Sequence, residues 1–140
     1  LISVQIITFA FALIKIYIMS KRELDVSDIL LETIIEGIQE VKGVNTAILD
    51  LKKIETAICK YFVICSGTSN THVSSIADSV KKIVSKKIQD KPWHIEGLNT
   101  SEWVLLDYSD IVVHVFQEET RDFFRLEDLW GDAAIRTIEN

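Results

Sequence analysis

Two short segments of the sequence carry side chains that could do chemistry. The first is Gly67-Thr68-Ser69, which follows an apolar run and opens a helical pattern. A Gly turn at a helix N-terminus can bind phosphate through backbone N–H groups, and Ser69 is a candidate nucleophile. The nucleophile-elbow spacing G-x-S-x-G and the Walker pattern are both absent from the sequence. We therefore favour a structural turn with a helix cap, and keep a nucleotide-binding turn as the alternative.

Asp107 and Asp110 are the second candidate, as a pair of catalytic carboxylates. They flank the turn Tyr108-Ser109, and Asp is common in turns. Nucleotidyltransferases hold magnesium through two acidic residues that alternate along one strand. The strand after the Gly67 helix shows no Asp-x-Asp or Asp-x-Glu pattern. The sequence therefore predicts a binding protein without catalytic residues, and a nucleotidyltransferase-like enzyme is the alternative.

Histidine and cysteine are too scattered along the sequence for a metal site. No two of His72, His94 and His114 have helical metal spacing, and Cys59 and Cys65 lack the paired spacing of a zinc site. His114 lies inside an apolar run, where a lone His is typical of a hydrogen-bonded core or interface residue. We predict no metal, no cofactor, and two half-buried thiols in a reducing compartment such as the cytoplasm.

The charge balance indicates the class of partner. The sequence has 21 acidic against 15 basic residues, a formal net charge of −6. Proteins that bind RNA or DNA mainly through phosphates need a basic surface. An acidic protein instead suits a protein partner rich in Lys and Arg, because complementary fields speed encounter. We therefore expect no DNA partner and a contact made with protein.

The apolar spacing predicts the elements that position these residues. A length of 140 residues, 48% of them hydrophobic, suits one domain with a real core. The run at 61–65 is typical of a strand buried on both faces, and two strands near residue 108 are close enough for an antiparallel hairpin. The fold class is therefore α/β, a single domain with a mixed β-sheet flanked by helices. The predicted helices cover residues 25–41, 70–87 and 120–130, and the predicted strands cover 45–51, 61–65, 103–107 and 110–116.

The first eighteen residues, LISVQIITFAFALIKIYI, are nearly all apolar, with one charge at Lys15. The run barely reaches the ~20 residues of a membrane span, and it lacks the basic start and small-residue cleavage site of a signal peptide. Met19 is the only Met, and a polar stretch follows it. We expect residues 1–18 to be an apolar extension from an over-extended gene start and residues 19–140 to be the working domain. A membrane-tethered regulator is the alternative.

Several motifs resemble the Iojap family, also called the ribosomal silencing factor (RsfS) family. The matching segments are residues 61–69, Glu96-Gly97, residues 103–116 and residues 121–130, and the likeness spans about residues 24–134. Ordered motifs at the right separations are more specific than one short pattern. The resemblance implies a fold related to nucleotidyltransferases but without their catalytic carboxylates, in agreement with the missing acidic pattern.

The resemblance also implies a function that needs no chemistry. It implies binding to ribosomal protein L-fourteen, on the face of the large subunit that meets the small subunit. A protein lodged there would block subunit joining sterically and repress translation, so the effect would scale with affinity and concentration. A homodimer is a further expectation for the free protein, because an apolar docking face tends to find a partner. No membrane partner is expected.

Aromatic and acidic side chains around the expected hairpin suit such a contact, with aromatic anchors and charges that steer. Trp103 and Tyr108 are the expected anchors, although a core position is the equal alternative for both. Two positions depart from the family pattern, with Ser109 in place of Gly and Phe124 in place of Tyr. A positive φ at Ser109 would strain the turn. The expected contact residues are Trp103, Leu106, Asp107, Tyr108 and Asp110.

Overall fold

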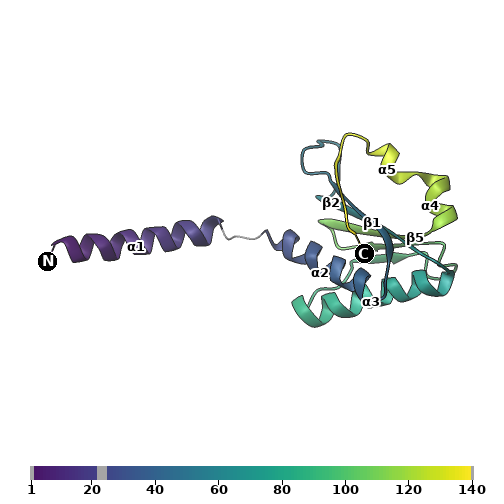
Figure 1. Cartoon of the computed structure of the whole chain (residues 1–140), viewed down its shortest axis with the longest axis horizontal. Helices are drawn as coiled ribbons and strands as arrows, with labels where there is room; N and C mark the ends of the chain where they lie inside the picture. Colours follow the sequence, from purple (N-terminus) through teal and green to yellow (C-terminus); the bar gives the residue numbers. More distant parts are fainter. Residues whose placement is uncertain (1, 22–24, 140) are drawn as a thin grey trace.

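The computed structural model describes residues 2–21 and 25–139, with a six-stranded sheet at its centre (Figure 1). The strands lie in the order β3-β4-β5-β2-β1-β6. β2 and β5 run parallel and the other four neighbouring pairs run antiparallel, which confirms the mixed sheet. The strands are β1 (Val44–Asp50), β2 (Tyr61–Gly67), β3 (His94–Glu96), β4 (Trp103–Asp107), β5 (Ile111–Gln117) and β6 (Ala134–Thr137).

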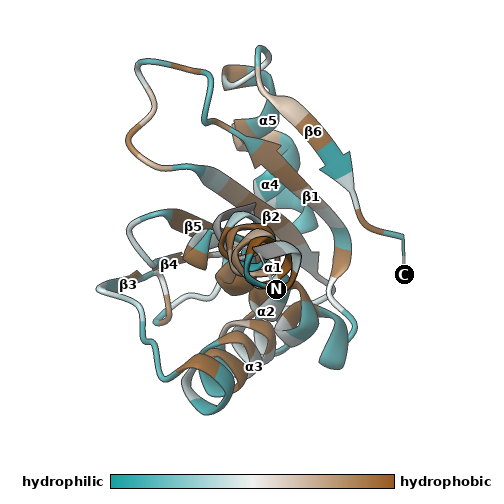
Figure 2. Ribbon diagram, turned by 90° about the vertical axis from the view of Figure 1, so that its left-hand side faces the viewer, coloured by the Kyte–Doolittle hydropathy of each residue, from teal (hydrophilic) through white to brown (hydrophobic). Residues whose placement is uncertain are grey.

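Two helices, α2 (Val26–Glu40) and α3 (Asn70–Ile88), cover one face of the sheet, which we call the inner face (Figures 1 and 2). The carboxylate of Asp25 caps α2 by accepting a hydrogen bond from a backbone N–H at 3.2 Å. The Ser69 hydroxyl caps α3 in the same way at 3.1 Å. Both helices were predicted, and the structure confirms them. The sequence left Asp25 and Ser27 as alternative caps of α2, and the structure selects Asp25.

Close packing between α2 and α3 depends on glycine. A Cβ at Gly37 would lie 2.8 Å from the Val80 Cα, so a larger residue would force the helices apart. The sequence suggests that Gly43 adopts the left-handed conformation after α2, but Lys42 adopts it instead, with φ 58. Gly43 is required for space, because a Cβ there would collide with Ile38 Cγ2.

The opposite, outer face of the sheet is covered in part by α4 (Glu118–Phe124) and α5 (Leu126–Leu129). The segment between β1 and β2 also packs on this face, through Ile54, Ala57 and Cys59. The predicted single helix over 120–130 is wrong, because Arg125 adopts the left-handed conformation with φ 48 and turns the chain. The sequence suggests Thr120 as the cap of this helix, but α4 begins after Gln117 without a side-chain cap. We call residues 118–130 the elbow.

The apolar extension forms α1 (Ile2–Lys21), drawn apart from the sheet in Figure 1. Its large apolar side chains are exposed, from 42% at Ile18 to 71% at Phe11. In the part of the chain that the structure describes, no helix is both long and apolar enough to cross a membrane. Met19 falls within α1, and residues 22–24 lie outside the described residues. A working domain that begins at residue 19 stays a prediction.

Candidate functional site

The hairpin of β4 and β5 carries the five expected contact residues and divides them between two faces. Strand alternation turns Trp103 and Asp107 to the outer face, where both are half-buried. Leu106 and Tyr108 turn to the inner face and are 0% and 4% exposed, inside the cluster that packs on α2 and α3. These two side chains therefore offer no surface to a partner in this structure.

An aromatic cluster surrounds Trp103 on the outer face. Its indole stacks on Phe116 with ring centroids 4.7 Å apart and contacts Phe124 of the elbow at 4.9 Å. Phe62 packs edge-on against Trp130, also of the elbow, at 5.6 Å. Stacked and edge-on contacts are the arrangements that aromatic rings prefer. Trp103 is thus a half-buried platform that joins the hairpin to the elbow.

His114 lies beneath this platform and is 4% exposed. Its Nδ1 accepts a hydrogen bond from the Trp103 indole N–H at 3.1 Å, so the neutral ring carries its proton on Nε2. Nε2 has no hydrogen-bond partner among the described residues. Burial lowers the pKa of His114 from 6.5 to about 4, so the ring is neutral at physiological pH. The prediction of a hydrogen-bonded core histidine is confirmed.

The turn between β4 and β5 is strained at Ser109, whose φ is 75. The Asp107 carboxylate accepts a hydrogen bond from the Ser109 backbone N–H at 2.7 Å, which holds the turn closed. This position therefore does need a positive φ, the conformation that glycine adopts without cost. Asp107 serves the turn and still reaches the outer face.

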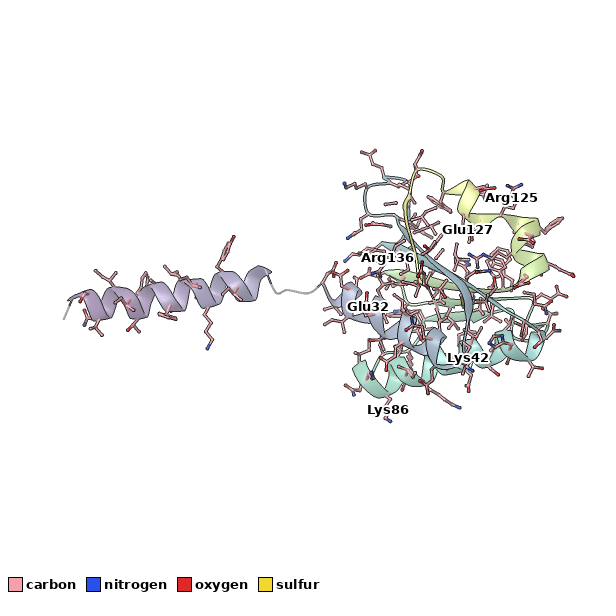
Figure 3. All side chains as sticks on the ribbon, in the orientation of Figure 1. Glu32, Lys42, Lys86, Arg125, Glu127 and Arg136 are labelled. Atoms are coloured by element: carbon pink, nitrogen blue, oxygen red, sulfur yellow. The ribbon has the colours of Figure 1, made fainter. Side chains whose placement is uncertain are left out.

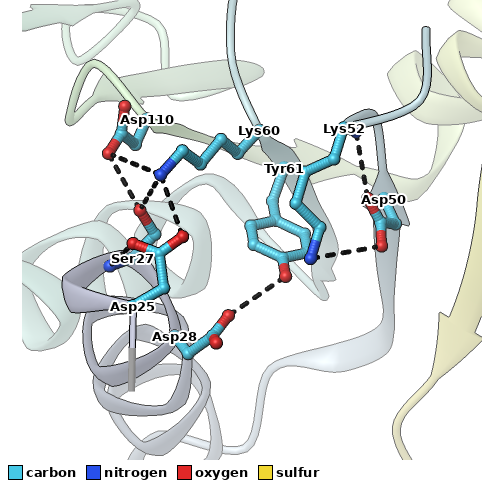
Figure 4. Close-up of polar contacts among 8 residues, drawn as sticks. All are labelled: Asp25, Ser27, Asp28, Asp50, Lys52, Lys60, Tyr61 and Asp110. Carbon is cyan, nitrogen blue, oxygen red and sulfur yellow. Dashed lines mark hydrogen bonds and ion pairs between the residues drawn. The ribbon is translucent and has the colours of Figure 1, made fainter. Parts of the chain in front are cut away.

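Asp110 belongs to a polar clasp between the hairpin and the start of α2 (Figure 4). Its carboxylate accepts a hydrogen bond from the Ser27 hydroxyl at 2.8 Å and lies 3.7 Å from Lys60 Nζ. Lys60 also donates to Asp25 at 2.9 Å and to Ser27 at 3.0 Å. The hydrogen bond from Lys60 lowers the pKa of Asp25, and the same bond raises the pKa of Lys60. Asp110 is therefore a structural tie as well as a surface charge.

Three of the backbone donors around Gly67-Thr68-Ser69, those of Thr68, His72 and Val73, are already used within the chain. The Thr68 N–H donates to His72 Nδ1 at 2.9 Å, and His72 Nε2 lies 2.7 Å from the Val41 carbonyl. The backbone N–H groups of His72 and Val73 donate to the side chain and the carbonyl of Ser69. A phosphate that used these three donors would have to displace their present bonds. The geometry matches the favoured turn and cap.

Metal and thiol chemistry find no support in the described part of the chain. Among residues 2–21 and 25–139, no group of three or more His, Cys, Asp or Glu side chains could hold a metal. Burial raises the pKa of the half-buried Cys59 to about 11 and of the fully buried Cys65 to about 12. Both thiols are protonated at neutral pH and therefore poor nucleophiles.

Comparison with known proteins decides the family. Residues 24–140 match the family described as "Ribosomal silencing factor during starvation". The chain belongs to the ribosomal silencing factor family. It is 36% identical over 111 residues to the ribosomal silencing factor of Halalkalibacterium halodurans. The matched region covers 79% of this chain and 92% of that protein. It is 39% identical over 92 residues to the factor of Bacillus subtilis, covering 65% of this chain and 75% of that protein.

A solved structure of a protein from Chromobacterium violaceum shares the fold. It superposes with a TM-score of 0.69 at 33% identity and covers 73% of this chain and 83% of that chain. Membership in the ribosomal silencing factor family supports a ribosome-associated role in silencing translation. The names of the relatives describe regulatory factors and not enzymes.

The elbow of this silencing factor is the part of the outer face that sequence reasoning missed. Phe123 and Leu129 are 80% and 75% exposed, and Phe124, beside Trp103, is 47% exposed. The sequence did contain one indication of this. Around the axis of a single helix, the apolar residues between 123 and 130 are too widely spread to share one face. Some of them had to remain exposed.

Proposed function

We propose that this chain binds ribosomal protein L-fourteen on the large subunit and blocks subunit joining by steric exclusion, which represses translation. The observation that carries the proposal is the outer face. It combines the Trp103 platform with an elbow whose Phe123 and Leu129 side chains are largely exposed. Large apolar side chains gathered at the surface are typical of an interaction site. The identity of the partner comes from the family resemblance.

The charges around the outer face suit a basic partner. Asp107 lies at its hairpin end, and the exposed carboxylates of α4 belong to Glu118, Glu119 and Asp122. Asp110 contributes less, because Lys60 and Ser27 already engage its carboxylate. Carboxylates at the rim of an apolar centre would steer a Lys- and Arg-rich protein into place. Leu106 and Tyr108 support this surface from the inner side of the sheet.

The proposed repression requires only that the protein occupies its site on the large subunit, without any chemical reaction. Repression would follow the ratio of free factor to its dissociation constant. Docking is assigned to residues 19–140, on ribosomes in the cytoplasm, and the extension 1–18 takes no part. When the protein is free, the same outer face would pair with a second copy, so self-association and ribosome binding would compete.

Co-sedimentation with separated ribosomal subunits tests the proposal. We expect the chain to pellet with large subunits and not with small ones. The double variant Phe123→Ser/Leu129→Ser should weaken binding about tenfold or more, because exposed apolar anchors dominate binding energy. Its fold should be unchanged, since both side chains lie in water.

The matched control is Val26→Ser, which removes a 78% exposed apolar side chain from α2 on the inner-face side. The control should bind like the wild type. Equal binding by the double variant would refute the proposed site. Failure of the wild type to bind large subunits would refute the function itself.

A further inference from the structure

Apolar packing holds the elbow to the sheet only weakly. Neither α4 nor α5 contains a buried residue. Leu126 and Trp130 are half-buried against the outer-face cluster, while Phe123 at the end of α4 lies mostly in water. The chain enters the elbow from β5 and leaves it toward β6, so its two ends are fixed. Apolar contacts therefore hold the elbow only in part, and polar contacts can decide the position of its middle.

Arg121 of α4 makes the polar contacts that fix this middle. Its side chain is only 15% exposed. Nε donates to Glu127 Oε1 at 2.8 Å, and Nη2 lies 2.7 Å from the same oxygen. Nη1 donates to the Asn45 carbonyl at 2.7 Å and to Ser66 Oγ at 2.9 Å. One guanidinium therefore connects α4 with α5, β1 and β2.

The Asn45 carbonyl is available to Arg121 because β1 is irregular at this point. The register of β1 against β2 shifts between Val44 and Ala47, and Asn45 has φ 51. A bulge of this kind leaves its extra residue outside the ladder of sheet hydrogen bonds. The second acceptor, Ser66, is 1% exposed and rigidly placed in β2. The sheet thus presents two fixed acceptors to the elbow.

We propose that Arg121 is a positioning residue that, with Glu127, latches the elbow in the pose that can dock on a ribosomal partner. The proposal rests on the proposed function, because docking is the activity that the latch serves. A free elbow would dock only in the fraction of molecules with the correct pose, and the apparent affinity would fall by that fraction. The guanidinium of Arg presents five N–H donors in a fixed planar fork, whereas Lys presents three donors on one flexible ammonium and cannot reproduce that geometry.

Arg125 provides a matched control four residues away in the same elbow. It is 72% exposed and pairs only locally, with Asp128 at 2.7 Å. Figure 3 labels Arg125 and Glu127, with Glu127 nearer to the sheet. Arg121→Met and Arg125→Met remove the same charge and leave side chains of the same length. A difference in binding between the two variants is therefore due to the latch contacts and not to the change in net charge.

The experiment measures large-subunit binding and hydrogen–deuterium exchange on the full chain. We expect Arg121→Met to weaken binding about tenfold or more, as for other truncated buried charge pairs, and Arg125→Met to change it less than about twofold. Exchange should accelerate in Arg121→Met at residues 118–130 and stay at the wild-type rate in β2. Arg121→Lys and Glu127→Gln should be intermediate, and they carry the test if Arg121→Met does not fold.

Three results would overturn the latch. These are equal binding by Arg121→Met and Arg125→Met, acceleration of exchange throughout the sheet, and unchanged exchange in the elbow. Acceleration throughout the sheet would mean that Arg121 merely stabilises the fold. If the wild type itself fails to bind large subunits, the proposed function is refuted, and the exchange comparison alone then supports or refutes the latch.

Discussion

Acid should destabilise this protein through His114. The buried ring is neutral in the folded state because its pKa is lowered from 6.5 to about 4. Below pH 6.5 the His114 side chain binds a proton in the unfolded chain but not in the folded chain. The contribution of His114 to the unfolding free energy is therefore fully present above pH 6.5 and is lost as the pH falls toward 4. Between pH 7 and pH 5 the loss is about 2 kcal/mol. That is a large part of the stability of a small domain.

Urea unfolding followed by tryptophan fluorescence at pH 7 and pH 5 measures this loss. The variant His114→Gln keeps an acceptor for the Trp103 N–H but does not titrate. We expect the change in unfolding free energy between the two pH values to be smaller in the variant by about 2 kcal/mol. His94→Gln makes the same substitution at an exposed histidine and serves as the control. The same pH dependence in His114→Gln and wild type would refute the assignment.

Two substitutions in the hairpin should not destabilise the fold. Ser109→Gly should raise the unfolding free energy by about 0.5 kcal/mol, because relief of the left-handed strain exceeds the added freedom of the unfolded chain; urea denaturation measures this, and a lower midpoint would contradict it. Tyr108→Phe should be neutral or stabilising by up to about 1 kcal/mol, because the buried Tyr108 hydroxyl has no partner among the described residues. A loss above about 1 kcal/mol in thermal or urea melts would mean that this hydroxyl is satisfied in solution.

The apolar pattern was sufficient to predict the inner half of the fold. α2, α3 and the β4–β5 hairpin follow from periodicity and caps, because each buries a continuous stripe. β3 and β6 were not predicted, since both are short edge strands whose residues are mostly exposed. Such strands are defined by their neighbours in the sheet and carry little pattern of their own.

The break in the elbow was also beyond the sequence pattern. Arg125 takes a left-handed conformation that Gly or Asn would have signalled, and Arg gives no such signal. In the sequence, Arg121 does not differ from any other charged residue on a helix. Its acceptors on β1 and β2 are far away in sequence. Contacts of this kind appear only when the chain is folded.

The division of the hairpin residues, by contrast, was available from the sequence. Residues 103 and 107 have the same parity and residues 106 and 108 the other, so no flat strand can present all of them together. The five expected contact residues do not follow this alternation. The alternation places Leu106 and Tyr108 in the core and leaves Trp103 and its neighbours on the outer face.

The hydrogen bond between Trp103 and His114 governs what the outer face offers a partner. Because the indole N–H is satisfied inside the protein, a partner meets only the apolar part of the ring and need not supply an acceptor. In the proposed docking mode, polar selection would then fall to Asp107 and the carboxylates of α4 at the rim. Rim charges mainly set the rate of encounter, and apolar centres mainly set residence time. If the proposed docking mode holds, the rate of arrival at the partner and the residence time on it would thus depend on different side chains.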